Sequence, residues 1–292
     1  MTSPIIIDNF MVSQIKACPR KYFWRVEKGL VNMIRPSFAP TFGIAVHKAM
    51  EAFYLGGTSL EATRAFLESY IPFWKRFGNP EVSRTPELGV EIVDGFCTQF
   101  ENDPYKTVEG CVEIGFMTEL TPDVLYCGRI DRMVEIGGDV YVLDWKTSSM
   151  PWLFCERPND QGTGYVWGAG EIKGVKIEGV IFDVIHTRAT SLKAQKEGTP
   201  KWLTDRRISG RSAWEVEEWK ETTLHYAGMI KGCQASGVWV KNGEACVNYN
   251  QICEYAQLCN SQGVMQDRIM ENEYEVSKWE PFEGAMDGGE VE

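Results

Sequence analysis

The sequence predicts a mixed α/β fold in which helices flank one central sheet. Over the first hundred residues the apolar side chains recur at helical spacing, and the next fifty residues alternate in the manner of strands. No internal repeat and no linker separates these two parts. We therefore expect one domain over residues 1–270, followed by an acidic, flexible tail at residues 271–292.

Helices are expected first along the chain, and strands follow them. Ser13 offers a helix cap, and Gly56 with Gly57 suits a helix end. The expected helices cover residues 13–29, 42–57, 60–77, 87–103, 159–172 and 211–232. The expected strands are residues 107–120, two arms of a hairpin within 128–149, and residues 175–189, and a cysteine-rich segment follows at 241–260.

The composition is that of a globular protein with enough apolar side chains for a sizeable core. Of the 292 residues, 43% are hydrophobic. No stretch approaches the roughly 18 consecutive apolar residues of a membrane span. The N-terminus lacks the basic flank and long apolar core of a signal peptide. We expect a cytoplasmic protein with no membrane partner.

Charge is unevenly distributed along the chain. The formal net charge is -11, but residues 271–292 alone hold eight acids and one lysine. Residues 186–212 are basic, with seven Lys or Arg against two acids. This excludes a uniformly basic nucleic-acid coat and leaves room for a local basic groove, although a solvated surface explains most single charge runs. Three arginines of this stretch are candidate DNA contacts: Arg188, Arg206 and Arg207.

A hairpin at residues 128–149 places two acids opposite each other. Gly137 and Gly138 separate two β-rich runs and suit a type I′ turn, because both turn positions need a positive φ. With that turn Ile136 pairs with Asp139, and the same register sets Asp131 against Asp144. Like charges opposite each other on neighbouring strands destabilise the pair.

A divalent cation would remove this repulsion. Carboxylate oxygens are preferred ligands of Mg²⁺ and Mn²⁺. Lys146 follows Asp144 by two residues and therefore points to the same face of the strand. There it could orient water or stabilise charge on a phosphate. The alternative from this pattern alone, a solvated hairpin with an Asp–Lys pair, has similar weight.

The motif G-R-I-D…V-L-D-W-K-T resembles that of the PD-(D/E)XK nuclease superfamily. The RecB-like branch of that family, including phage-encoded members, carries two further signatures that this chain matches. One is a histidine on an early helix, here His47 in GIAVHKAMEAF, and the other is Q-x-x-x-Y after the catalytic lysine, here Gln161 and Tyr165. Alone, His47 would be a partly buried structural histidine, but the order and spacing of all these residues support the resemblance.

This resemblance implies a role for each matched residue. The metal ligands would be His47, Asp131, Asp144 and the main-chain carbonyl of Trp145, and the catalytic lysine would be Lys146. Gln161 and Tyr165 would contact the DNA backbone or support that lysine. Glu113 matches an acid often found before the first motif aspartate, although it could equally lie on a strand's solvent face.

Nine cysteines without an export signal argue against a disulfide framework. Five lie singly among apolar or small residues and are expected in the core: Cys97, Cys111, Cys127, Cys155 and Cys233. Three more fall within fourteen residues: Cys246, Cys253 and Cys259. Some RecB-like nucleases, such as AddB and CRISPR adaptation nucleases, hold a [4Fe–4S] cluster with one cysteine before the nuclease core and three after it. That resemblance implies Cys18 as the fourth ligand and would close the C-terminal segment on the N-terminus.

The cysteine assignment leaves two alternatives open. The chain lacks the close C-x-x-C pair of AddB-type proteins. Zn²⁺ could therefore occupy the four cysteines, or Cys233 could replace one ligand.

The resulting expectation is an Mg²⁺- or Mn²⁺-dependent deoxyribonuclease. It would act as an exonuclease on single-stranded DNA or DNA ends, in phage or bacterial recombination, repair or replication. Its partners would be DNA and a phage or host recombinase, helicase or single-strand-binding protein, in the host cytoplasm for a phage-encoded protein. One alternative is a non-catalytic DNA-binding recombination partner that retains the nuclease fold and metal cluster. A third possibility is an unrelated metal hydrolase. The clustered thiols and the small number of histidines, three in the whole chain, argue against it.

Overall fold

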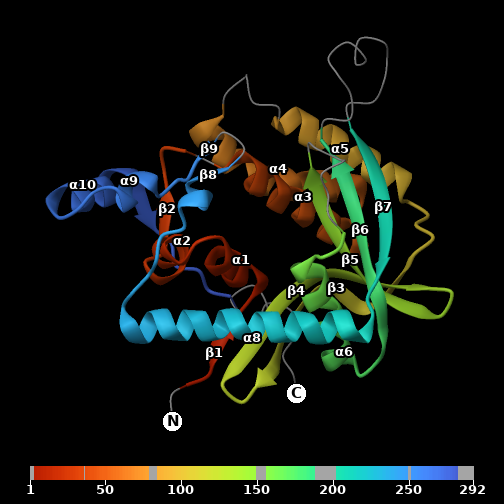
Figure 1. Cartoon of the computed structure of the whole chain (residues 1–292). Coiled ribbons are helices and arrows are strands. Elements are labelled where there is room, and N and C mark those ends of the chain that lie inside the picture. The colour runs from red at the N-terminus through yellow and green to blue at the C-terminus, as the bar shows by residue number, and fades with distance from the viewer. Residues whose placement is uncertain are drawn as a thin grey trace. The chain divides into compact units, whose positions relative to one another are not determined.

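The computed structural model describes residues 3–35, 37–78, 84–148, 156–187, 202–248 and 251–281 (Figure 1). The chain divides into two compact units. The central unit consists of Ser37–Phe116 and Arg129–Ala213. The terminal unit consists of Met1–Pro36, Met117–Gly128 and Trp214–Glu292, so both ends of the chain contribute to it.

A six-stranded mixed sheet has the strand order β1-β4-β5-β6-β7, with β3 paired to β4. The strands are β1 (Ile5–Ile7), β3 (Lys106–Thr121), β4 (Val124–Ile136), β5 (Asp139–Ser148), β6 (Ile177–His186) and β7 (Leu203–Gly210). β1 runs parallel to the first part of β4, and β5 runs parallel to β6. The β4–β5 and β6–β7 pairs are antiparallel. This confirms the expected mixed sheet flanked by helices.

The β4–β5 hairpin has the register expected from its glycine turn. Ile136 pairs with Asp139, and the ladder continues to Arg132 opposite Leu143. Gly137 and Gly138 both have a positive φ, 64° and 95°, which residues other than glycine rarely adopt. One further step in this register would set Asp131 opposite Asp144, but the ladder ends at Arg132 and Leu143.

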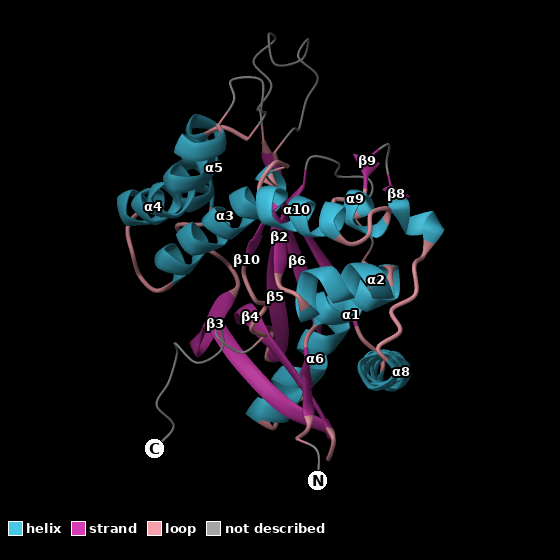
Figure 2. Cartoon of the chain, turned by 90° about the vertical axis from the view of Figure 1, so that its left-hand side faces the viewer, coloured by secondary structure: helices cyan, strands magenta, loops and turns pink. Residues whose placement is uncertain are grey.

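Helices cover both faces of the sheet in the central unit. Figure 2 shows α3 (Phe38–Tyr54), α4 (Ser59–Phe77) and α5 (Pro86–Gln99) gathered on one side of β5 and β6. Their buried side chains form one core with odd-numbered residues of β5 and β6, such as Trp145 and Ile181. Even-numbered residues of these strands point to the other face, where α6 (Asp160–Lys173) packs through Gly162 near Val180 and Phe182.

The terminal unit joins segments from the two ends of the chain. Besides β1 and the adjoining ends of β3 and β4, its elements are α1 (Asn9–Ala17), α2 (Pro19–Tyr22), η1 (Phe23–Glu27), β2 (Leu30–Asn32), α8 (Ala213–Ser236), η3 (Gly243–Cys246), β8 (Val247–Asn248), β9 (Gln251–Ile252), α9 (Ala256–Cys259), α10 (Val264–Glu273) and β10 (Tyr274–Val276). β10 pairs antiparallel with β2, which closes the C-terminal segment on the N-terminal one. Residues 271–281, expected as the start of a tail, therefore include helix and strand.

Two local features differ from the sequence expectation. The helix expected over residues 13–29 is interrupted, because Cys18 is extended and Pro19 begins a new helix at its first position. β7 was not expected, because the charged side chains of Asp205, Arg206 and Arg207 hide its alternation. None of the described helices is both long enough and apolar enough to span a membrane.

Candidate active site and metal centre

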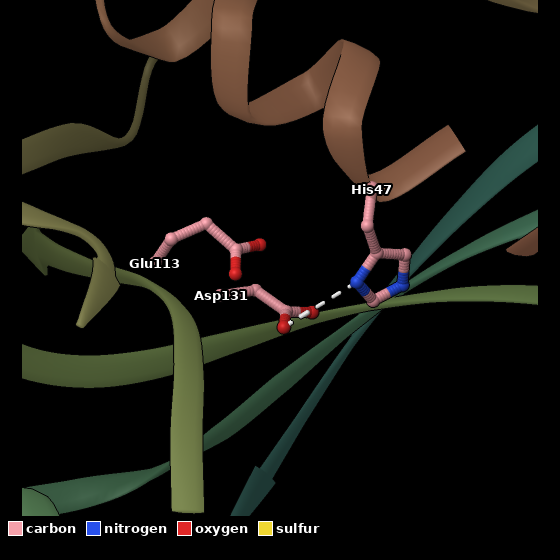
Figure 3. Close-up of side chains that lie close together, drawn as sticks. All are labelled: His47, Glu113 and Asp131. Atoms are coloured by element: carbon pink, nitrogen blue, oxygen red, sulfur yellow. Dashed lines mark ion pairs between the residues drawn. The ribbon is translucent and has the colours of Figure 1, made fainter. Parts of the chain in front are cut away.

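Three side chains from three elements of the central unit meet at one point. His47 comes from α3, Glu113 from β3 and Asp131 from β4 (Figure 3). One ligand atom of each lies within 4.8 Å of the other two, and the described residues contain no other such group of three. A histidine nitrogen and two carboxylate oxygens suit a divalent cation such as Mn²⁺.

The main chain of Trp145 links two of these ligands. Its N–H donates to Asp131 Oδ2 at 2.7 Å, and its carbonyl oxygen lies 2.7 Å from His47 Nε2. The other ring nitrogen of His47, Nδ1, is 3.5 Å from Asp131 Oδ1. Where the β4–β5 ladder ends, the Trp145 N–H thus donates to the Asp131 side chain. The Trp145 carbonyl oxygen, expected as a metal ligand, therefore lies next to the ring of His47, the histidine expected to bind the same cation.

Glu113 reaches the site from a strained backbone. Its φ is 51°, a left-handed conformation that residues other than glycine rarely adopt and that favours Gly or Asn. One oxygen, Oε1, is buried without a hydrogen-bond partner among the described residues. Glu113 Oε2 is 3.6 Å from the Arg129 guanidinium. Strain and an unpartnered carboxylate oxygen at the same residue are typical of a ligand position.

The charges of His47, Glu113 and Asp131 shift one another's pKa values. Burial and the Asp131 carboxylate raise the pKa of Glu113 to about 7. Burial acts to lower the pKa of His47, but Asp131 outweighs it and raises that pKa to about 9. Burial acts to raise the pKa of Asp131, yet His47 and Lys146 hold it below its usual range. A bound cation would take the place of the histidine proton, so its affinity should fall with falling pH.

Lys146 is held between two acceptors on the opposite face of β5 from Trp145. Its ammonium lies 2.6 Å from Asp144 Oδ2 and donates to Gln161 Oε1 at 2.8 Å. Gln161 in turn donates through Nε2 to the Tyr165 hydroxyl at 2.9 Å. The Q-x-x-x-Y pair is one helical turn apart on α6, so both side chains face the same strand.

The structure pairs the acids differently from the simplest sequence interpretation. Asp131 and Asp144 were expected to share one cation, yet the 4.8 Å group contains Glu113 and not Asp144. Asp144 instead pairs with Lys146, two residues along the same strand face. Burial raises the pKa of Asp144 to about 6, although Lys146 opposes this.

The four candidate cluster cysteines lie in the terminal unit. The main-chain N–H of Asn242 donates to Cys18 Sγ at 3.3 Å, and the main-chain carbonyl of Asn242 accepts from Cys246 Sγ at 3.6 Å. The Cys253 amide donates to the Cys246 carbonyl at 2.8 Å. Cys253 and Cys259 pack against the same apolar cluster around Tyr255. No three described cysteines bring their sulfurs within 4.8 Å of one another.

The remaining cysteines largely follow the core expectation. Cys97, Cys111 and Cys127 are buried, and Cys233 on α8 is half-buried. Cys155 lies outside the described residues.

The candidate DNA-binding arginines have different outcomes. Arg188 lies outside the described residues. The Arg206 guanidinium bonds to Asp183 at 2.8 Å and to Asp103 at 2.7 Å, and only 11% of its side chain is exposed. This corrects the expectation for Arg206, because two buried carboxylates already hold its charge inside the protein. Arg207 pairs with Asp205 at 2.6 Å and with Glu156 at 3.4 Å, which balances its charge locally.

Sequence reasoning missed the side chains behind Trp145. Tyr54 stacks on its indole, and Asp103 and Arg132 hold Tyr54 in place. Tyr54 lies seven residues after His47, and Arg132 directly follows Asp131. Only these short spacings to site residues could have pointed to them.

Comparison with solved structures supports the fold. A candidate exonuclease from Eubacterium rectale has a crystal structure that superposes with a TM-score of 0.51 at 13% identity, covering 83% of this chain and 88% of that chain. At that identity the likeness shows a shared fold. A structure named SSO0001 also matches, at 12% identity over 75% of this chain and 84% of that chain, with a TM-score of 0.32. No match was found among curated proteins.

A family comparison covers both the site and the cysteines. The pattern described as "PD-(D/E)XK nuclease superfamily" matches residues 11–260. That range includes the His47–Glu113–Asp131 group and the Lys146 pair on β5. The chain therefore belongs to the PD-(D/E)XK nuclease superfamily.

Proposed function

We propose that this protein is a metal-dependent deoxyribonuclease that degrades single-stranded DNA or DNA ends. The observation that carries the proposal is the meeting of His47, Glu113 and Asp131 at one point, with Lys146 on the neighbouring strand. Membership of the nuclease superfamily favours a phosphodiester as the substrate and DNA as its source.

The residues present fit a divalent cation. The donors are oxygen and imidazole nitrogen, and one carboxylate oxygen of Glu113 is buried without a partner among the described residues. We assign His47, Glu113 and Asp131 as Mg²⁺ or Mn²⁺ ligands, with Asp144 and the Trp145 carbonyl beside them. A cation bound there would polarise the phosphate and lower the pKa of a bound water.

Lys146 supplies a fixed positive charge next to this centre. Asp144 and Gln161 hold its ammonium from two sides, so it needs no reorganisation to face a phosphate oxygen. Tyr165 fixes the Gln161 amide and thereby the direction of the lysine. Lys146 would stabilise the charge that develops as water attacks, and Gln161 and Tyr165 would keep it in position or contact the DNA backbone.

The test is degradation of end-labelled DNA by purified protein with Mg²⁺ or Mn²⁺. Wild-type protein should shorten linear single strands, and Lys146→Ala should lower the rate about a hundredfold or more. Lys176→Ala is the control, because Lys176 is an exposed lysine paired with Glu178. Circular single-stranded DNA should survive if the enzyme needs an end.

The outcome also separates the alternatives. Wild-type degradation no faster than that of Lys146→Ala would contradict the nuclease proposal. Tight DNA binding without degradation would favour the non-catalytic recombination partner instead. Cutting of circular DNA would retain the nuclease and replace the exonuclease assignment with an endonuclease.

We infer further that Cys18, Cys246, Cys253 and Cys259 hold an iron–sulfur cluster. Asn242 contacts the sulfurs of Cys18 and Cys246, and a main-chain bond joins Cys246 to Cys253, so distant parts of the chain converge. In a tetrahedral zinc site the four sulfurs would stand about 3.8 Å apart, given Zn–S bonds of about 2.3 Å. No three sulfurs of the described cysteines lie within 4.8 Å of one another, so they do not form such a preformed zinc site.

Anaerobic purification followed by iron, sulfide and zinc analysis tests this inference. Wild-type protein should be brown and should contain iron and sulfide, and Cys253→Ala should lose both. Cys97→Ala is the control, because Cys97 is buried in the core of the central unit. Colourless protein with stoichiometric zinc would replace the cluster with zinc, and loss of iron in Cys233→Ala would add Cys233 to the ligands.

A further inference from the structure

Trp145 lies between two aromatic rings of the same helix. The His47 ring meets the indole edge to face at 5.8 Å, and the Tyr54 ring stacks on it at 5.6 Å with an interplanar angle of 14°. His47 and Tyr54 are seven residues apart on α3 and therefore share a helix face. The indole is fully buried, and its Nε1 has no hydrogen-bond partner among the described residues. Ring packing therefore fixes the orientation of this side chain.

Tyr54 is itself held by buried charges. Its hydroxyl donates to Asp103 Oδ2 at 2.7 Å, and the Arg132 guanidinium lies over its ring, 3.8 Å from the centroid. Arg132 is 1% exposed and bonds to Asp103 at 2.8 Å, to the Tyr105 carbonyl at 2.6 Å and to Thr107 at 2.9 Å. The ring is thus held from its edge and from one face.

A second arginine completes this arrangement. Arg206 bonds to both oxygens of Asp103, at 2.7 and 3.0 Å, and its side chain also reaches the Tyr54 hydroxyl at 3.2 Å. Asp183 accepts from the other edge of Arg206 at 2.8 Å. Two arginines and two aspartates balance one another inside the protein, which is the condition for burying charges without a large penalty. We call Tyr54, Asp103, Arg132, Asp183 and Arg206 the buried ion cluster.

We propose that the buried ion cluster positions the metal ligands His47 and Asp131 by holding Tyr54 against Trp145. The main chain of Trp145 donates to Asp131 and lies against His47, each at 2.7 Å. A shift of the indole would therefore reach His47 directly through its ring and Asp131 through the Trp145 main chain. Residues that orient metal ligands typically alter metal affinity tenfold to a hundredfold. Tyr54 is accordingly a positioning residue, and this role rests on the metal centre proposed above.

The experiment is calorimetric titration of the full-length protein, as purified, with Mn²⁺ in the absence of DNA. Tyr54→Leu removes the stacked ring and should raise the Mn²⁺ Kd about tenfold or more. Tyr54→Phe keeps the ring and loses its bond to Asp103, so we expect a smaller rise of about threefold. Both variants are compared at a temperature where circular dichroism shows them fully folded.

Tyr70 provides the matched controls. It is fully buried in the same core, donates its hydroxyl to the Arg84 carbonyl at 2.6 Å, and packs against Phe42 and Phe66. Tyr70→Leu and Tyr70→Phe should lower the Tm and leave the Mn²⁺ Kd at the wild-type value. If Tyr54→Leu does not fold, the two Phe variants decide the question.

The outcomes separate this inference from the proposed function. Weaker Mn²⁺ binding in the Tyr54 variants alone supports it. Equal Kd values in the Tyr54 and Tyr70 variants overturn it and leave the nuclease intact. Wild-type protein that binds no Mn²⁺ overturns the metal centre and this inference with it.

Discussion

At the scale of single residues, Glu113 combines an unfavourable backbone with an unsatisfied side chain. Its φ of 51° and its buried Oε1, which has no hydrogen-bond partner in the described part of the chain, both cost stability. Neither feature helps to form β3, in which Gly110 is the one other described residue with a positive φ. The proposed metal centre explains why a glutamate occupies this position.

Substitution of Glu113 should separate stability from metal binding. Without metal, Glu113→Gly should have a higher free energy of unfolding than Glu113→Gln, by about 1 kcal/mol, because only glycine relieves the left-handed strain. Mn²⁺ should raise the Tm of the wild-type protein and of neither variant. Thermal unfolding with EDTA and with Mn²⁺ measures both effects. A wild-type Mn²⁺ response in Glu113→Gln would remove Glu113 from the ligands.

At the scale of elements, the buried ion cluster joins α3, β4, β6, β7 and the segment before β3. Asp103 lies at its centre and accepts from Tyr54, Arg132 and Arg206. Burial acts to raise the pKa of Asp103, but bonds from Arg206 and Tyr54 outweigh it and hold the pKa well below its usual range. The ionised carboxylate is therefore favoured by the folded state.

The pH dependence of Asp103 follows from this direction. A carboxyl group with a lowered pKa contributes stability that is present above its unfolded pKa of about 3.9 and is lost as pH falls below it. At pH 7, Asp103→Asn should cost about 3–5 kcal/mol, because it leaves two buried arginines with one aspartate. Urea unfolding at pH 7, 5 and 3 should show this difference shrinking toward pH 3.

An exposed ion pair serves as the comparison for Asp103. Asp123 pairs with Lys231 on the surface of the terminal unit. Asp123→Asn should change the stability little at any of the three pH values, because solvent screens such pairs. A constant difference between wild type and Asp103→Asn from pH 7 to pH 3 would contradict the role given to the carboxylate charge.

At the scale of the whole molecule, the terminal unit depends on pairing between the two ends of the chain. β2 pairs with β10, and Tyr255 donates its hydroxyl to the Leu30 carbonyl at 2.7 Å. Trp279 donates to Asp8 at 2.7 Å, and its ring lies 4.1 Å from that of Phe10. The proposed cluster ligands lie within this same unit, with Cys18 from one end and three cysteines from the other.

Truncation tests this closure. A chain ending at residue 273 loses β10 and Trp279, and its Tm should fall by about 6 °C or more, since the buried Tyr274 ring and the half-buried Trp279 ring are removed. A chain ending at residue 281 keeps all the described contacts and should unfold at the wild-type temperature. Differential scanning calorimetry measures both. An unchanged Tm in the shorter chain would show that the closure contributes little.

Local sequence rules are enough to predict the hairpin and the motif residues on it. The Gly137-Gly138 turn fixes the register of β4 and β5, and strand alternation then places Asp144 and Lys146 on one face. Helical spacing likewise places Gln161 and Tyr165 together on α6. These are local rules, so no knowledge of distant parts of the chain is needed to apply them.

Which acids meet His47, and what holds Trp145 in place, depends on the packing of distant elements. Glu113 joins the site through its own left-handed backbone conformation in β3, which its sequence does not predict. Tyr54, Asp103 and Arg206 come together from segments as much as 152 residues apart. β7 carries the Arg206 side chain inward rather than toward solvent, because Asp103 and Asp183 hold it there. Packing between distant elements sets these contacts, so they cannot be predicted from the order of charges along the chain.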